Sequence, residues 1–147
     1  MAGIDFVNMG AKLPTLASAG SQAYSLGYVT PTNCTGFKIA NPKIVADAAY
    51  TALTASHCTI SLKALDATGA STTLCSGTLG TTASGFMGDL TANLATALPF
   101  NTGMSTKVIT VGNGCTILAY INNSAQTAAT GPTLPLIAFD VVAVNAV

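Results

Sequence analysis

The chain has 147 residues and no net charge at pH 7, because five lysines balance five aspartates and arginine and glutamate are absent. Charged residues make up 7% of the chain, against about a quarter in an average globular domain. We expect no nucleic acid partner, since a phosphate backbone attracts clustered cations and the lysines are spread over positions 12, 38, 43, 63 and 107.

The length fits one domain with a packed core. Hydrophobic residues form 50% of the chain, which is far from the composition of disordered proteins. Ala, Thr, Gly and Ser together make up 71 of the 147 residues, so hydroxyl groups and small side chains should form most of the surface. With so little charge repulsion, we expect the protein to self-associate through apolar patches, as a homotrimer or a higher assembly.

The first residues, 1–22, mix Gly, Pro and Ser with isolated large apolar residues and show no sustained period of two or 3.6. This pattern predicts an extended N-terminal arm, followed by a sandwich domain over residues 23–147. Because apolar side chains gain free energy when a neighbour covers them, the arm is a candidate bridge between subunits. Its predicted interface residues are Ile4, Phe6, Val7, Met9 and Leu13.

No basic region precedes an apolar stretch at the start of the sequence, so we expect no signal peptide and no export by that route. The most apolar segment, residues 134–147, contains Asp140 and is shorter than the roughly 20 residues that a membrane helix needs. We therefore expect no membrane partner and predict a buried C-terminal strand. Asp140 either faces solvent on a half-exposed strand or is buried beside a hydrogen-bond donor.

The middle of the chain predicts short strands between turns. Apolar runs at 23–29 and 37–40 read as strands, the second ending at Asn41-Pro42. Residues 42–56 favour a strand with an adjoining irregular or helical turn. Alternation from Cys58 to Ala64, a turn at 66–69 and a return strand at 71–79 predict a hairpin.

Two further elements follow from local signals. Asp89 could cap a short helix, because leucines at 90, 94 and 98 fall at helical spacing and Pro99 ends it. Residues 107–111 and 115–121 flank Asn113-Gly114, a strong tight-turn signal, and predict a second hairpin. Before the helix, Phe86 and Met87 in a glycine-flanked loop form the one apolar pair that looks displayed, which makes them candidate interface residues, with core capping as the alternative.

Short strands every eight to twelve residues predict an all-β fold, a single β-sandwich of jelly-roll type with at most one short helix. An immunoglobulin-like sandwich is the second choice, because its buried tryptophan is missing from a chain without Trp.

Catalytic and metal chemistry find little support in the residues. The cysteines at 34, 58, 75 and 115 contain no CxxC spacing, so we predict no metal site and read Cys58 and Cys115 as small hydrophobes, with one disulfide among the four as the alternative. His57 neighbours Cys58, but adjacent strand residues point to opposite faces and cannot form a dyad unless the backbone bends there, so we read His57 as a surface or loop residue. The glycines match no nucleotide-binding motif. We expect no enzyme and no cofactor.

A low-charge, Ala- and Thr-rich sandwich that begins with the apolar arm MAGIDFVNMGAKLP and ends with LPLIAFDVVAVNAV resembles the small capsid decoration (cement) proteins of tailed bacteriophages. The resemblance implies a virion structural protein on the outer capsid surface, a trimer that binds the major capsid protein and bridges shell subunits. The alternative is a carbohydrate- or receptor-binding sandwich of a virion fibre or cell surface, which would need exposed aromatic platforms.

Overall fold

The computed structural model describes residues 6–15, 20–29, 35–51, 58–79, 87–110, 114–123 and 132–144, with the backbone only for Phe6 and Val7. These residues form nine strands, and no helix lies within them, which confirms the all-β prediction. The strands are β1 (Phe6–Lys12), β2 (Ser21–Val29), β3 (Gly36–Val45), β4 (Cys58–Asp66), β5 (Ser71–Leu79), β6 (Thr96–Ala97), β7 (Ile109–Thr110), β8 (Cys115–Asn122) and β9 (Leu136–Val144).

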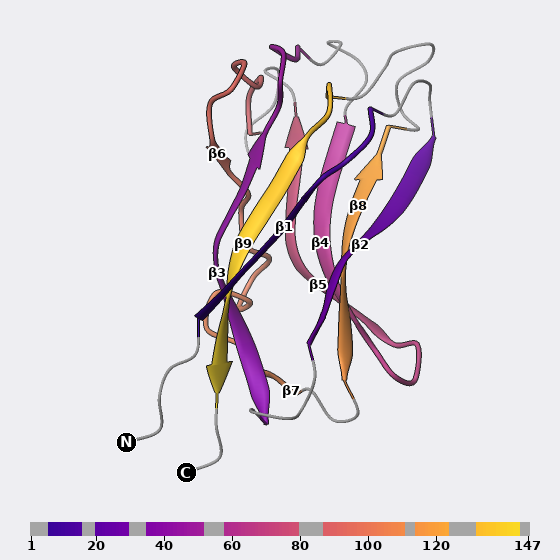
Figure 1. Ribbon diagram of the computed structural model, residues 1–147, viewed down its shortest axis with the longest axis vertical. Coiled ribbons are helices and arrows are strands. Elements are labelled where there is room, and N and C mark those ends of the chain that lie inside the picture. The colour runs from indigo at the N-terminus through magenta and orange to yellow at the C-terminus, as the bar shows by residue number, and fades with distance from the viewer. Residues whose placement is uncertain are drawn as a thin grey trace.

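The strands build two antiparallel sheets that pack against each other (Figure 1). Sheet A has the order β1-β9-β3-β6, with β7 also paired to β3, and sheet B has the order β2-β8-β4-β5. The chain changes sheet between β1 and β2, β2 and β3, β3 and β4, β5 and β6, β7 and β8, and β8 and β9. This is the topology of a jelly roll, in which Greek-key connections wrap two sheets around one core. The predicted jelly-roll sandwich is confirmed, and the immunoglobulin-like order is not the one observed.

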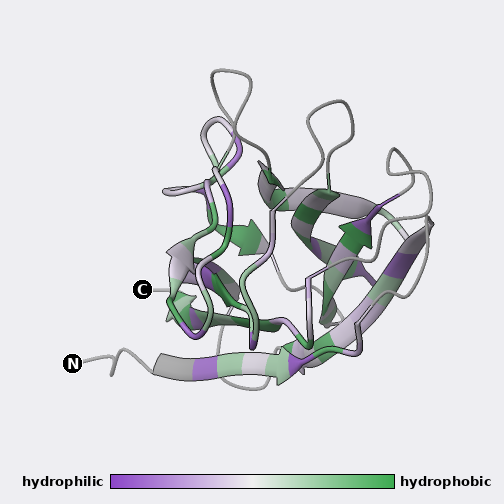
Figure 2. Ribbon diagram, turned by 90° about the horizontal axis from the view of Figure 1, so that it is seen from above, coloured by the Kyte–Doolittle hydropathy of each residue, from purple (hydrophilic) through white to green (hydrophobic). Residues whose placement is uncertain are grey.

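Alternation of side chains creates the core. Burial in β8 alternates residue by residue from Cys115 to Asn122, and green and pale bands alternate along the strands in Figure 2. The inward faces of both sheets meet with large aliphatic and aromatic groups that exclude water, the main source of folding free energy. The bulkiest of these fully buried side chains include Phe37, Ile44, Ile60, Leu62, Ile117, Ile121, Ile137 and Phe139.

β3 does not end at Asn41-Pro42 as predicted but continues to Val45. The register against β9 shifts between Ala40 and Lys43, and Asn41 adopts a φ of 50°. This bulge accommodates a proline, which has no N–H to offer the ladder, inside a long strand. The chain then bends after Val45, in line with the predicted irregular turn, while residues 52–57 lie outside the described part.

The helix predicted from Asp89 to Leu98 is wrong. Leu90 and Tyr50 exchange two backbone hydrogen bonds of 2.9 Å, and Leu98 donates its N–H to the Pro42 carbonyl at 2.9 Å. Asn93 adopts a φ of 58°, which no helix allows. Asn93 N–H also donates to the Ala46 carbonyl at 2.8 Å, so several backbone groups of this segment bond to residues 42–50 and tertiary pairing outweighs the local leucine spacing.

Residues 87–101, which we call the cross-sheet segment, join the two sheets along the β3 and β5 edges. Towards sheet B, Met87 N–H donates to the Thr78 carbonyl at 2.9 Å and Ser76 N–H donates to the Pro99 carbonyl at 3.1 Å. Towards sheet A, β6 pairs with β3. This side of the sandwich is therefore closed by backbone hydrogen bonds.

The hairpin predicted around Asn113-Gly114 is also wrong. β7 pairs with Gly36 and Phe37 of sheet A, whereas β8 lies in sheet B between β2 and β4. The turn signal is local and does not reveal that the two strands belong to different layers. Residues 111–113 lie outside the described part.

Part of the predicted N-terminal arm lies within sheet A. β1 pairs along its whole length with β9, from Phe6 opposite Val142 to Lys12 opposite Leu136. Leu13 donates its N–H to the Pro135 carbonyl at 2.8 Å, and its side chain is 3% exposed. The predicted division into an arm at 1–22 and an independently folding domain at 23–147 stays a prediction.

Candidate assembly surfaces

The predicted interface residues take up different places. Ile4 and Phe86 lie outside the described residues, and for Phe6 and Val7 only the β1 backbone is placed. Leu13 is buried in the chain's own core, so in this conformation its side chain is not offered to a neighbour.

Met9 and Met87 are half-buried and pack against the core. The Met9 side chain fills the space beside Gly27 of β2, and Met87 fills the space beside Gly77 of β5, where a Cβ atom would collide with each thioether. Each methionine therefore covers a glycine on an edge strand of sheet B. Contact of either residue with another chain stays a prediction.

The outer face of sheet A carries a polar cluster around Asp140. Asn8 of β1 donates its Nδ2–H to Asp140 Oδ1 at 2.9 Å, and Asn41 of β3 donates its Nδ2–H to Asp140 Oδ2 at 2.8 Å. The Asn41 and Asn8 hydrogen bonds and the nearby Lys43 charge lower the pKa of Asp140. Asp140 is half-exposed on the outer face, which agrees with the prediction that it faces solvent on a half-exposed strand. Its two hydrogen bonds link β9 to its neighbours β1 and β3.

A second charge pair lies at the end of the same sheet. Lys12 Nζ and Asp47 Oδ2 are 2.7 Å apart, with the two side chains 54% and 42% exposed. Such an exposed pair contributes little to stability, about 0–1 kcal/mol. It does, however, neutralise one of the five lysines within the chain.

The outer face of sheet B is rich in hydroxyl groups. The hydroxyls of Thr59 and Thr78 lie 3.2 Å apart and those of Ser61 and Ser76 lie 3.1 Å apart, so β4 and β5 are paired by side chains as well as by backbone. This face therefore presents polar groups that are already bonded to each other.

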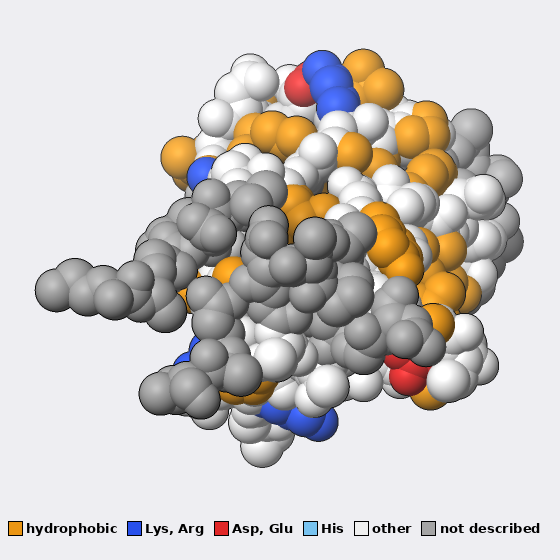
Figure 3. Space-filling view, turned by 60° about the horizontal axis from the view of Figure 1, so that its bottom comes forward, with side chains coloured by type: hydrophobic (Ala, Val, Ile, Leu, Met, Phe, Trp, Pro, Cys, Tyr) orange, Lys and Arg blue, Asp and Glu red, His pale blue; other side chains and the backbone are white. Residues whose placement is uncertain are grey.

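The same face holds one lysine beside an aromatic ring. Lys63 Nζ lies 4.5 Å from the centroid of the Tyr120 ring, and the Tyr120 hydroxyl donates to Ser21 Oγ at 3.1 Å. Both the ring and the hydroxyl of Tyr120 thus interact with residues of the same chain. Across the face seen in Figure 3, charged side chains are few and stand apart among uncharged and apolar ones.

Three cysteines are free thiols buried in the core, Cys58, Cys75 and Cys115. This confirms the reading of Cys58 and Cys115 as small hydrophobes, while Cys34 lies outside the described residues. Burial raises the pKa of Cys58 and of Cys75 to about 12, and it also raises that of Cys115. A thiolate, the reactive form, is therefore scarce at neutral pH.

His57 lies outside the described residues, so its predicted surface position stays a prediction. Within the described ranges, no group of three or more His, Cys, Asp or Glu side chains could hold a metal ion. Nor does any helix there have the length and apolar character to span a membrane.

No family model matches the chain, and no curated protein matches it. Among solved structures, it is similar to a chain in the structure of infectious bursal disease virus, Gx strain, with 12% sequence identity and a TM-score of 0.28. The match covers 97% of this chain and 40% of the viral chain. A TM-score this low carries no argument about function, which we base on topology and surface chemistry.

Proposed function

We propose that the chain is a virion structural protein that decorates the outer surface of a bacteriophage capsid and stabilises it by bridging neighbouring shell subunits. In this proposal the protein is made in the host cytoplasm, assembles as a homotrimer and binds the major capsid protein. It uses no cofactor and binds neither nucleic acid nor membrane.

The observation that carries the proposal is a jelly-roll topology combined with outer faces that carry few charges, several of which are met within the chain. Jelly rolls recur in viral capsid proteins and in lectins, which is an argument by fold analogy. On the two outer faces, Lys12 bonds Asp47, Asp140 accepts from two asparagines, and Lys63 lies over Tyr120. Such surfaces associate through shape and apolar area more than through long-range charge.

A non-enzymatic role fits the titratable groups that the structure describes. The three buried thiols have raised pKa values, which is the opposite of what a cysteine nucleophile needs. Asp66 and Asp140 have lowered pKa values, which suits fixed charges rather than general acids at neutral pH.

The carbohydrate-binding alternative has less support. Sugar sites use open aromatic faces, yet Lys63 lies over the Tyr120 ring, and Tyr50 is 9% exposed. Tyr24 is half-buried, and Tyr28 is the most exposed of the four tyrosines at 56%. Among these tyrosines, a single exposed ring does not form a platform.

The test is to mix the purified protein with capsids of the same virus that lack it, and to sediment the capsids. We expect saturable attachment, a raised melting temperature of the capsid, and a trimer mass by native mass spectrometry. A protein that stays in the supernatant at tens of micromolar, or that instead binds a defined oligosaccharide on a glycan array, would contradict the proposal.

A further inference from the structure

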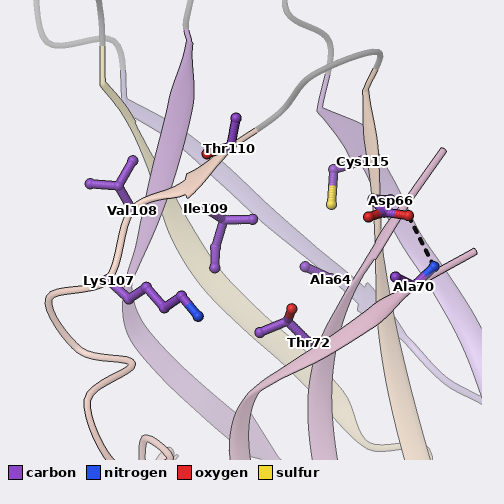
Figure 4. Close-up of a pocket in the computed structure, with 9 residues that line it drawn as sticks. All are labelled: Ala64, Asp66, Ala70, Thr72, Lys107, Val108, Ile109, Thr110 and Cys115. Atoms are coloured by element: carbon purple, nitrogen blue, oxygen red, sulfur yellow. Dashed lines mark hydrogen bonds between the residues drawn. The ribbon is translucent and has the colours of Figure 1, made fainter. Parts of the chain in front are cut away.

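An open pocket lies at one end of the sandwich, where the β4–β5 hairpin faces the segment that contains β7 (Figure 4). It encloses about 180 Å³. One wall comes from sheet B and the other from residues 107–110 next to sheet A. The lining residues are Ala64, Asp66, Ala70, Thr72, Lys107, Val108, Ile109, Thr110 and Cys115.

The pocket exists because the two sheets are not joined here in the part of the chain that the structure describes. Asn101 N–H donates to the Leu74 carbonyl, and the cross-sheet segment follows β5 from that point towards Thr78. β7 pairs with Gly36 and Phe37 of β3 along the edge of β7 that faces away from the pocket. The stretch of β5 before Leu74 and the other edge of β7 therefore face each other across an opening.

The floor and part of the rim are apolar. Ala64 and Cys115 are buried at 3% and 1% exposure, and Ile109 packs against the core. Val108 also lines the pocket and is 40% exposed, one of the few large apolar side chains left in water among the described residues. In Figure 4 its side chain points away from the centre of the pocket, and it lies beside Gly36 of β3. An occupant that covered Val108 would gain the free energy of removing this surface from solvent.

Two opposite charges flank the apolar floor. In Figure 4 the Lys107 side chain extends into the pocket from the side opposite Asp66. Asp66 Oδ1 accepts from Thr68 N–H at 2.9 Å, Thr68 Oγ1–H at 2.7 Å and Ala70 N–H at 3.0 Å, which fixes the carboxylate in the turn. The Thr68 hydroxyl and the turn's backbone N–H groups lower the pKa of Asp66, so it is ionised at neutral pH.

We propose that this pocket seats one apolar side chain of the major capsid protein, while an acidic residue of the same peptide segment lies against Lys107. The inference rests on the proposed function and names the docking site. A cavity of about 150 Å³ in another protein holds a benzene ring, so 180 Å³ suits a phenyl or branched aliphatic group. The Asp66 carboxylate repels an acidic group, so the acidic residue of the capsid peptide lies at the Lys107 side of the pocket and the direction of the peptide is fixed.

The experiment compares pocket variants with matched surface variants in the capsid attachment assay. Lys107→Glu reverses the charge at the pocket, and Lys38→Glu on β3 makes the same change elsewhere. Val108→Asp places a charge on the apolar rim, and Leu94→Asp does so at another exposed apolar site, 57% exposed. All four proteins should keep the melting temperature of the unmodified chain, because none of the four side chains is buried.

We expect Lys107→Glu and Val108→Asp to weaken attachment about tenfold or more, and the two controls to stay within about twofold. Equal attachment of pocket and control variants would overturn the docking site while the decoration role stands. Failure of the unmodified protein to attach to any capsid would remove both. If the pocket variants lose self-association instead of attachment, the occupant is a second copy and the proposal is wrong.

A cross-linking arm tests the chemistry of the occupant. A Val108→Cys protein, with Cys34→Ser to remove the cysteine outside the described residues, carries a thiol-linked benzophenone and is photolysed on capsids. We expect the cross-linked capsid peptide to contain a large apolar residue close to Asp or Glu. A peptide without an acidic residue would contradict the role given to Lys107.

Discussion

The two sides of the sandwich are closed in different ways. On the side of β3 and β5, the cross-sheet segment donates and accepts backbone hydrogen bonds with both sheets. On the side of β1 and β2, the neighbouring edge strands belong to different sheets (Figure 1). There the Met9 side chain fits over Gly27. We call these the bonded side and the packed side.

The difference separates two sources of cohesion. Backbone bonds on the bonded side are directional and leave few unpaired groups at the sheet edges, which protects an edge against unwanted strand pairing. On the packed side, apolar contact holds β1 and β2 near each other. The backbone hydrogen bonds of β1 are made to β9, which keeps β1 in sheet A. We expect the packed side to open first when the protein is stressed.

The largest effect should come from deleting residues 2–16. The deletion removes β1, its ladder with β9 and the buried Leu13, whose burial alone contributes about 1.5–3 kcal/mol. We expect a melting temperature lower by 10 °C or more, or loss of the transition, and a matched deletion of residues 2–5 should shift it by far less. A truncated protein that melts like the intact one would show that residues 17–147 fold without β1.

A single substitution probes the bonded side. Leu98 in the cross-sheet segment is 2% exposed, so Leu98→Ala should cost about 2–5 kcal/mol in the free energy of unfolding. Leu94, in the same segment but 57% exposed, provides the control, and Leu94→Ala should stay within about 0.5 kcal/mol. Urea denaturation measures the free energy of unfolding of both variants. An equal loss in the two would mean that Leu98 contributes nothing to the hydrophobic core.

Hydrogen exchange compares the two sides without a mutation. The amides of Ser76 and Leu98 donate to carbonyls across the bonded side, whereas those of β1 lie in an edge strand next to the packed side. We expect β1 amides to exchange through local opening, faster than Ser76 and Leu98, by about tenfold or more. Slower exchange in β1 would reverse the order of opening.

The smallest effect concerns Asp140, which links β1 to β3 across β9 through Asn8 and Asn41. Its folded pKa is lowered, so its stabilising contribution is fully present above the ordinary aspartate pKa of about 3.9 and is lost as pH falls through the folded pKa. Asp140→Asn should remove this part of the acid dependence and lower stability slightly at pH 7.

Asn8→Ala provides the matched comparison, since it removes only the β1 bond. Thermal melts of the three proteins between pH 2 and 7 measure the difference. If Asp140→Asn melts with the same dependence on pH as the unmodified protein, the loss of stability in acid comes from other carboxylates.

Sequence patterns predicted the elements that carry a local signal in the sequence. The β4–β5 hairpin follows from alternation and from a turn at Asp66, and β9 follows from its apolar run, because these signals lie within a few residues of one another. The cross-sheet segment was mistaken for a helix because the leucine spacing is local, whereas its hydrogen-bond partners, such as Pro42 and Tyr50, lie far away in sequence.

The candidate surfaces were harder to predict for the same reason. Nothing in the sequence says that Leu13 turns into the chain's own core or that Asn8 and Asn41 meet at Asp140, since these contacts join residues about a hundred or more positions apart. The pocket combines the ends of β4 and β5 with residues 107–110 from the other sheet. Its walls become visible only once the layers are known.

The position of β9 has a consequence for synthesis on the ribosome. In sheet A, β9, the last of the nine described strands in chain order, lies between β1 and β3, and in sheet B the late strand β8 lies between β2 and β4. Neither sheet can reach its final order until β8 and β9 have emerged, so β1 and β2 wait without their final neighbours during translation. Such long-range pairing is slow and leaves strand edges exposed, which makes the nascent chain a client for chaperones.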